Sequence, residues 1–295
     1  SLLSSLQSEK KRRELNEKLI KYTLILAAAI SILTTFGILF SILFEAIEFF
    51  QLRSFWYFLT GTIWSPGVAN SQFGALPIFA GTFVITIIAL LVAIPIGLGS
   101  AIYMSEYASS KLRDYLKPIL EILAGIPTVV YGFFAAITVA PLVVKVAAFF
   151  GLEATFNSAL ASGIVMGIMI IPLISSLSDD VIRAVPDSQR KAAFALGMTH
   201  GETIKNIVIP SAMPGIISAS LLALSRALGE TMIVVMAAGL RPNLSWNPLE
   251  DMTTVTVTIV NSLVGDFEFN SPETLSAFAL GLVLFIVTLI LNMIS

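Results

Sequence analysis

Long apolar runs without a charge constrain the fold of this chain more than any other feature of its sequence. The first run extends from Tyr22 to Phe44 and exceeds the ~20 residues that a helix needs to cross the core of a bilayer. Of the 295 residues, 56% are hydrophobic and 12% are charged, which is more apolar surface than one soluble core requires. The sequence therefore predicts an all-α polytopic membrane protein.

The apolar runs divide the chain into six predicted membrane-spanning helices. We expect them at about 20–45, 76–103, 117–141, 158–178, 211–239 and 274–294, with a short interfacial helix over 142–150. Residues 46–75 are too aromatic and too interrupted for a span, which indicates helices that lie at the membrane interface. We accordingly divide the chain into an N-terminal segment, 1–19, and one transmembrane domain, 20–295.

Basic residues predict the orientation, because Lys and Arg in short loops are retained on the cytoplasmic side of a membrane. The N-terminal region and the second and fourth connections carry most of them: Lys10, Lys11, Arg12, Arg13, Lys18, Lys21, Lys111, Arg113, Lys117, Arg183, Arg190, Lys191 and Lys205. The other connections contain one each, Arg53, Lys145 and Arg241. We therefore expect both termini in the cytoplasm and the acid-rich segment 240–273 outside.

What the sequence lacks argues against several function classes. It has no Cys and one His, His200, which are too few ligands for a Cys- or His-based metal centre. It has no Gly-x-x-x-x-Gly-Lys-Ser/Thr motif, so we expect no nucleotide bound by a P-loop. The net charge of −2 shows none of the basic excess that favours nucleic acid as a partner. We expect no catalytic residue, no metal and no cofactor in this chain.

A polar, basic segment over about 180–210, which we call the basic loop, separates the fourth and fifth predicted spans. Pro186 favours the start of a helix, and residues 188–196 are helix formers. Gly197 is typical of a helix end at which φ becomes positive. The basic loop is therefore expected to begin with one short helix.

A second short helix is predicted directly after this glycine. Thr199 and Glu202 have the spacing of a capping box, and the helix should extend over about 200–208 before Pro210 begins the next span. Two short helices at an angle would form a compact protrusion. By itself the pattern also fits an ordinary solvated loop between membrane helices.

The fifth predicted span contains two opposite charges, Arg226 and Glu230. A spacing of four places them on one face of a continuous helix, close enough to pair. Ionised residues at this depth are costly and typically face a bundle interior or a water-filled path. The planar guanidinium matches a tetrahedral oxyanion, and a neighbouring carboxylate would accept the proton of hydrogen phosphate, which sulfate lacks. Arg226, Glu230, Ser225 and Thr231 are therefore the candidate substrate path; the alternative is a neutralised pair that only fixes helix packing.

The basic loop resembles the cytoplasmic loop by which the permease subunits of ABC importers bind their ATPase. In that family the pattern is Glu-Ala-Ala, three residues, Gly, nine residues, Ile, one residue and Leu-Pro. Gly197, Ile207 and Pro210 keep this spacing. Lys191 stands in place of the Glu, and Ile209 in place of the Leu. The resemblance implies that the ATPase is contacted by Lys191, Ala192, Ala193, Gly197, Glu202, Ile207 and Pro210.

Further segments resemble the permease subunits of phosphate importers, the PstC family. They are Arg226–Met232, Ala124–Gly132, and Trp64–Pro66 ahead of Phe73–Pro77. This resemblance covers essentially the whole chain from about residue 20. It implies the fold of a type I ABC importer permease, a location in the bacterial inner or plasma membrane, and inward transport of inorganic phosphate.

The same resemblance implies a set of partners. They are a second permease subunit similar to PstA, an ATPase dimer similar to PstB that binds ATP and Mg, a phosphate-binding protein similar to PstS, and membrane lipid. Permeases for sulfate, molybdate or amino acids share the docking pattern, so another oxyanion is the alternative substrate. A secondary carrier would also explain charges inside the membrane, and a structural or signalling subunit would need no polar path. Both classes stay open at this point.

Overall fold

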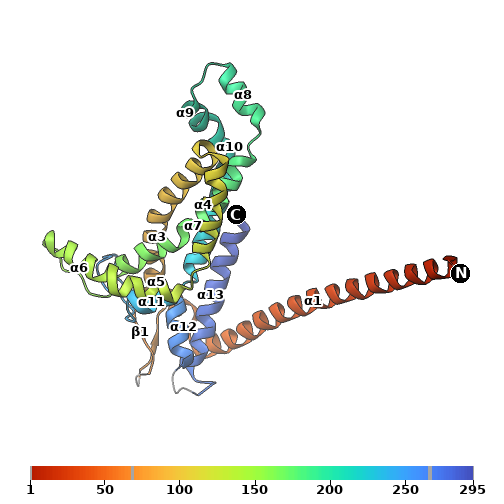
Figure 1. The fold of residues 1–295 in the computed structure, drawn as a ribbon. Helices are drawn as coiled ribbons and strands as arrows, with labels where there is room; N and C mark the ends of the chain where they lie inside the picture. Colours follow the sequence, from red (N-terminus) through yellow and green to blue (C-terminus); the bar gives the residue numbers. More distant parts are fainter. Residues whose placement is uncertain (1, 68–69, 265–267, 295) are drawn as a thin grey trace.

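The computed structural model describes residues 2–67, 70–264 and 268–294, with side chains from Arg12 onward. Most of the chain is helical (Figure 1). In chain order the elements are α1 (Leu2–Leu52), α2 (Phe55–Thr60), β1 (Trp64–Ser65), β2 (Gln72–Phe73), α3 (Leu76–Ile102), η1 (Tyr103–Tyr107), α4 (Ser110–Ala124), α5 (Thr128–Phe134), η2 (Ala135–Val139), α6 (Ala140–Phe149), α7 (Ala159–Ala184), α8 (Asp187–Ala195), α9 (His200–Thr203), η3 (Ile204–Val208), α10 (Ile209–Leu228), α11 (Met232–Ala237), α12 (Val255–Val264) and α13 (Pro272–Ile294). The elements η1, η2 and η3 are short π-helical turns.

Within the described residues, six helices are long and apolar enough to cross a membrane, which confirms the predicted number. They are Arg12–Leu52, Leu76–Tyr107, Thr128–Phe149, Ala159–Ala184, His200–Leu228 and Pro272–Ile294. All six overlap the predicted spans, but the third and fifth are displaced along the chain from their predicted bounds.

The third predicted span is wrong. Residues 117–141 are not one helix, because the chain breaks at Gly125–Pro127, between α4 and α5. Pro127 has no backbone N–H to donate to the preceding helix. The run 142–150, predicted as a separate interfacial helix, is instead the end of the continuous helix Thr128–Phe149.

The centre of the body is the pair α3 and α7, with α10 packed against both. These two helices approach each other closely because glycines of α7 lie at their interface. A side chain at Gly163 would collide with Ile88, and a side chain at Gly167 would collide with the backbone oxygen of Ala89. Small residues at such contacts are typical of helices that pack inside membranes.

Residues 46–75 are only partly helical, and their position at the membrane interface stays a prediction. The end of α1 occupies their first part, and after α2 the chain forms an antiparallel hairpin in which Trp64 is opposite Phe73. Phe49 packs edge-on against both Phe58 and Phe73, with ring centroids 5.5 Å apart. Phe49 and Phe58 are fully buried, so these aromatic rings form a compact cluster that joins α1, α2 and the hairpin.

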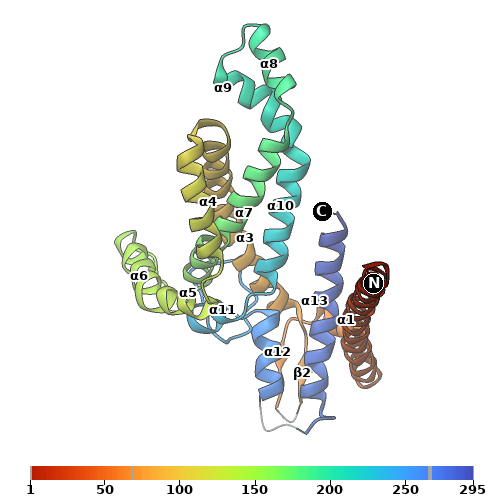
Figure 2. The same ribbon diagram turned by 45° about the vertical axis from the view of Figure 1, so that its right-hand side comes forward.

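The helix α1 extends away from the body beyond this aromatic cluster (Figure 1). The most apolar part of Arg12–Leu52 buries none of its residues against the rest of the chain. Its helix neighbour is α13, which lies beside it in Figure 2. The apolar surface of α1 is therefore available to lipid or to another membrane subunit.

The two ends of the body carry different elements. Figure 1 shows α8 and α9 at one end and the β1–β2 hairpin at the other, and α13 runs from the hairpin end toward the α8–α9 end. Segment 240–273 contains the helix α12, in which Val255 and Val257 are buried. The side chains of Lys10 and Lys11, which entered the orientation prediction, lie outside the described residues. The sidedness stays a prediction.

Candidate functional site

The basic loop consists of the short helix α8 and the start of a second helix, joined by a tight turn. The first, α8, ends at Ala195, and Gly197 has a φ of +83°, as the sequence predicted. Thr199 and Glu202 form the predicted capping box. The N–H of Thr199 donates to Oε2 of Glu202 at 2.8 Å, and the N–H of Glu202 donates to Oγ1 of Thr199 at 3.3 Å. These local contacts fix the angle between the two helices.

The sequence predicted that the second helix ends before Pro210, and this prediction is wrong. Instead α9, η3 and α10 form one continuous helix over His200–Leu228. Pro210 is the second residue of α10, directly after the π turn η3. The wider turn accommodates a proline ring that would otherwise clash with a carbonyl one turn earlier. The basic loop is therefore rigidly continuous with a membrane-spanning helix.

A groove of about 520 Å³ lies between the two halves of the basic loop. It is lined by Gln189, Ala192, Ala193, Leu196, Met198, Asn206, Ile207, Pro210 and Ser211. Leu196 is 81% exposed, which leaves a large apolar side chain uncovered at the groove. Ala193 is 3% exposed, so its methyl group belongs to the interior of the loop.

The residues predicted to contact an ATPase differ in accessibility. Those exposed are Lys191, Ala192, Gly197, Glu202 and Pro210, whereas Ile207 is half-buried and Ala193 is buried. Lys191 has no acidic partner within ion-pair distance in the part of the chain that the structure describes. The ammonium group of Lys191 is therefore available to pair with an acidic group on another molecule.

Arg190 anchors the basic loop to the body. Its guanidinium pairs with Glu106 of η1 at 2.8 Å and also donates to the backbone carbonyls of Ile182, at 3.0 Å, and Val185. Both charged side chains are largely buried, with 15% of Arg190 and 6% of Glu106 exposed. Sequence analysis does not find this contact, because 84 residues separate the partners and no local pattern connects them.

A second set of ion pairs joins α4 to α7. Asp179, which is fully buried, accepts from Nη2 of Arg113 at 2.7 Å and from Nε at 3.2 Å. Lys117 lies 3.8 Å from Asp179 and also contacts Asp180. The hydrogen bond to Asp179 raises the pKa of Arg113 above its ordinary value. Asp179 is thus used inside the chain and is not accessible to a partner.

The fifth predicted span is interrupted as well. Helix α10 ends at Leu228, Gly229 follows it, and α11 begins at Met232. Arg226 and Glu230 therefore do not share one helix face, and among the described residues they form no ion pair. The predicted pair is wrong, because it assumed a helix that continues through Gly229.

Glu230 caps the start of α11 instead. Its Oε1 accepts from the N–H of Met232 at 3.0 Å and from the N–H of Ile233 at 3.3 Å. These N–H groups have no partner inside their own helix. The backbone oxygen of Glu230 also accepts from Oγ1 of Thr256 at 2.9 Å. Only 8% of the residue is exposed, so Glu230 is a structural residue that ties α11 to the chain before and after it.

Arg226 is exposed in the last turn of α10. It lies about 25 Å along the helix from Ile209, taking 1.5 Å for each residue. Ser225 and Thr231 are half-buried on either side of it in the chain. The four predicted path residues therefore differ in their surroundings. Arg226 is exposed, Ser225 and Thr231 are half-buried, and Glu230 is buried as a helix cap.

The two interrupted spans meet through α5 and α11, the helices that follow their breaks. A side chain at Gly132 of α5 would collide with Met236 of α11. The hydroxyl of Tyr131 in α5 donates to the carbonyl of Leu123 at 3.1 Å, across the break at Gly125–Pro127. Non-helical backbone at membrane depth is tolerated where it is buried in protein or lines a water-filled path.

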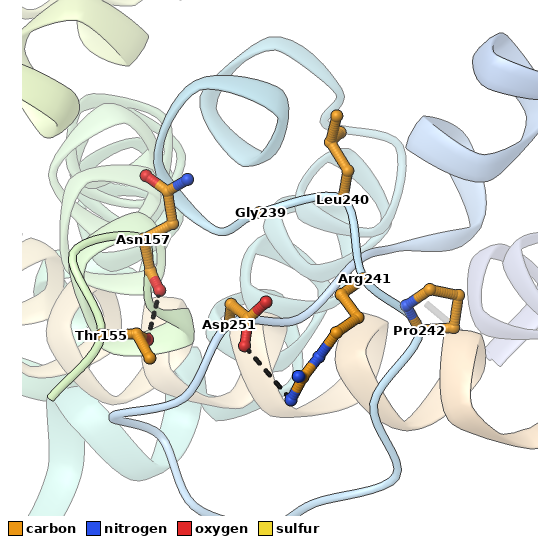
Figure 3. Close-up of a pocket in the computed structure, with 7 residues that line it drawn as sticks. All are labelled: Thr155, Asn157, Gly239, Leu240, Arg241, Pro242 and Asp251. Atoms are coloured by element: carbon orange, nitrogen blue, oxygen red, sulfur yellow. Dashed lines mark hydrogen bonds and ion pairs between the residues drawn. The ribbon is translucent and has the colours of Figure 1, made fainter.

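Figure 3 shows a cavity whose lining includes a basic residue, Arg241. It has a volume of about 840 Å³ and is lined by Thr155, Asn157, Gly239, Leu240, Arg241, Pro242 and Asp251. Arg241 and Asp251 point toward one another and lie 3.5 Å apart (Figure 3). Because these two charges offset each other, the cavity has little net attraction for an anion. Arg226 is the better candidate.

The extended segment that leads to this cavity is organised by Glu250. Its carboxylate accepts from Nδ2 of Asn243 at 2.8 Å and from Nδ2 of Asn247 at 3.1 Å. Side-chain hydrogen bonds, first of all from Asn243, lower the pKa of Glu250. The carboxylate therefore stays ionised, and its hydrogen bonds stay in place, well below neutral pH.

Comparison with known proteins identifies the family. The model for the binding-protein-dependent transport system inner membrane component matches residues 93–295. The probable ABC transporter permease protein YqgH of Bacillus subtilis is 36% identical, over 78% of this chain and 73% of its own. The phosphate transport system permease protein PstC of Mesorhizobium japonicum is 35% identical, over 90% of this chain and 84% of its own. The phosphate transport system permease protein PstC of Haemophilus influenzae is 31% identical, over 95% of this chain and 91% of its own.

A solved structure has a similar fold. The MetNI methionine ABC transporter, in inward-facing conformations, matches 75% of this chain and 90% of its own with a TM-score of 0.53 and 16% identity. At this identity the likeness concerns the fold alone. With its apolar helices and this family match, the chain is a multi-pass inner-membrane protein. It belongs to the family of binding-protein-dependent transport system inner membrane components, the permease subunits of ABC importers.

Proposed function

We propose that this chain is the permease subunit of an ATP-driven importer that carries inorganic phosphate inward after a binding protein delivers it. The observation that supports phosphate most is the similarity to phosphate transport permeases named PstC over most of both chains. The exposed cation Arg226, beside the break in the fifth span, supports an anion as the substrate. Sulfate or molybdate is the alternative.

Arg226 is the residue that we propose to meet the anion. Arg226 is exposed beside the interruption of the fifth span, and no carboxylate of the described residues lies within ion-pair distance of it. A planar guanidinium can donate two parallel hydrogen bonds to a tetrahedral oxyanion. Ser225 and Thr231 can supply hydroxyl donors beside it. Glu230 holds the backbone of this site through its cap on α11.

The basic loop is the proposed contact for the ATPase. Its exposed Leu196 and its groove offer an apolar surface at one end of the body, and Arg190 fixes that surface to the membrane helices. The partner ATPase, similar to PstB, would bind ATP and Mg, and this chain would take no part in hydrolysis. A second permease similar to PstA and a binding protein similar to PstS complete the proposed importer.

Two other classes make different predictions. A secondary carrier uses an ion gradient and commonly has inverted repeats, so it would transport without the ATPase. A purely structural or signalling subunit would transport nothing, and Arg226 would be dispensable.

The test is uptake by the whole importer. The chain is produced with its second permease, ATPase and binding protein, and uptake of labelled phosphate, sulfate and molybdate is measured with and without ATP. We expect ATP-dependent uptake of phosphate in preference to the other two. Uptake without ATP, or preferential uptake of sulfate or molybdate, would refute the proposal.

A further inference from the structure

Both helices of the basic loop contact the same π turn at the end of α3. Arg190 of α8 pairs with Glu106, and the ring of His200 in α9 packs edge-on against Tyr107 with 5.1 Å between the ring centroids. Glu106 and Tyr107 are consecutive residues of η1. His200 also stacks on Phe194 of α8, at 6.2 Å and an interplanar angle of 11°, which ties the two helices to each other.

The π turn η1 is a firm point of attachment. It continues α3 without a break, and the N–H of Ala108 donates to the carbonyl of Tyr103 at 2.9 Å to close it. Beyond it the chain becomes extended, with a ψ of 141° at Ala108. Single π turns inside helices are uncommon and occur frequently at functional sites. Here the turn directs Glu106, with 6% of its side chain exposed, into the basic loop.

The helix α3 cannot move independently of α7. A side chain at Gly97 would collide with Ile174, so the two backbones are in close contact near this end of the pair. Ser175 donates a hydrogen bond to Ser100 at 2.9 Å between the same helices. Packed interfaces of this kind transmit displacement rather than absorb it. A force on the basic loop that leaves the contacts at η1 intact must therefore carry the α3–α7 pair with it.

We propose that Glu106 and Tyr107 are positioning residues that couple the basic loop to α3, so that the loop and the α3–α7 pair move as one body during transport. This inference rests on the proposed function, because it takes the basic loop as the place where the ATPase acts. Glu106 acts through Arg190, and Tyr107 acts through His200. Neither residue is proposed to contact phosphate or nucleotide.

The first test measures the phosphate taken up for each ATP hydrolysed by the purified importer in proteoliposomes. Glu106→Gln removes the charge that pairs with the largely buried Arg190, and Tyr107→Ala removes the ring that contacts His200. Each change should lower the ratio of phosphate to ATP by about fivefold or more, as expected for lost coupling between two sites. The ATPase should still copurify, since the groove is untouched.

Two control variants are available, one in η1 and one in α4. Tyr103→Ala removes a half-exposed ring from the same π turn, and Tyr103 makes no ring contact among the described residues. Glu121→Gln removes an exposed carboxylate from α4. Both controls should keep the wild-type ratio. If Glu106→Gln and Tyr107→Ala also keep it, the contacts at η1 are static packing and the proposal is wrong.

The second test joins the loop to α3 covalently. The chain has no Cys, so Tyr107→Cys with His200→Cys gives one pair that a short, cleavable bifunctional thiol reagent can bridge. The double variant should couple poorly, and bridging should restore the ratio because it replaces the lost contact. If bridging instead stops transport and cleavage restores it, the loop moves relative to α3, which overturns the proposal. A wild-type importer that shows no ATP-driven uptake would overturn the proposed function itself.

Discussion

Arg226 and Glu230 lie four residues apart, yet they form no ion pair, and Glu230 instead caps α11 through the N–H groups of Met232 and Ile233. The helix that would have placed both side chains on one face ends between them, at Leu228. The two residues therefore have separable roles. Arg226 offers an unneutralised charge, and Glu230 fixes the backbone next to it.

The cap predicts a graded response at Glu230. Glu230→Gln keeps an oxygen that can accept from both N–H groups, so the yield of the assembled complex should stay close to that of wild type. Glu230→Ala removes the acceptor and should lower stability by ~1 kcal/mol, as loss of a helix cap does. Thermal unfolding of the purified complex measures both. Equal damage from the two substitutions would mean that the charge of Glu230 matters more than its cap.

The turn in the basic loop predicts that glycine is required at position 197 but not at position 201. Gly197 has a φ of +83°, so Gly197→Val should strain the backbone by ~1–2 kcal/mol and misplace the second helix. Gly201, in α9, has open space around it and no positive φ, so Gly201→Ala is the matched control. We expect ATPase-coupled transport to fall only with Gly197→Val, while the protein still inserts. Intact coupling in that variant would contradict this view of the loop.

The groove predicts different failures for two neighbouring residues. Leu196→Asp places a charge on an exposed surface, so the permease should assemble normally but recover less ATPase on copurification. Ala193→Asp places a charge in the interior of the loop and should disrupt the loop itself. Limited proteolysis between residues 187 and 210, done beside the copurification, distinguishes the two outcomes. Normal ATPase recovery with Leu196→Asp would show that the groove is not the contact.

The distribution of basic residues predicts which side each end of the body faces. Because the chain has no Cys, single substitutions can be labelled with a membrane-impermeant maleimide. Asn270→Cys, near the hairpin end, should react in intact cells, and Lys205→Cys should react only after lysis. The reverse pattern would invert the orientation.

Local signals explain why the basic loop could be predicted in detail. A positive φ at Gly197 and the capping box of Thr199 and Glu202 depend on residues within one or two turns of each other. The sequence therefore specifies them without knowledge of the rest of the fold. The exception was Pro210, whose accommodation by a π turn has no sequence pattern that we recognised.

Apolar character continues through both interrupted spans, so the hydrophobic pattern does not indicate where their helices break. Composition predicts that a segment lies in the membrane, but it does not show whether the helix is continuous. Gly229 followed by Glu230 is a sequence signal for the break in the fifth span. The glycine follows the end of α10, and the acid caps the start of α11. The contacts of Glu106 with Arg190 and of Asp179 with Arg113 lie beyond any such pattern, because they depend on how distant helices pack.

ATP-driven uptake of labelled phosphate by importers that carry Arg226→Lys or Arg226→Ala tests the proposed substrate path most directly. Arg241→Ala, which removes a guanidinium already paired with Asp251, is the control. Arg226→Lys should lower uptake by about tenfold, because hydrogen bonds between charged groups contribute ~1.5–3 kcal/mol and the fork is lost. Arg226→Ala should abolish uptake, while all three complexes assemble with normal yield and Arg241→Ala transports as wild type does. Wild-type uptake of phosphate by Arg226→Ala would contradict the role of Arg226 as the residue that meets the anion.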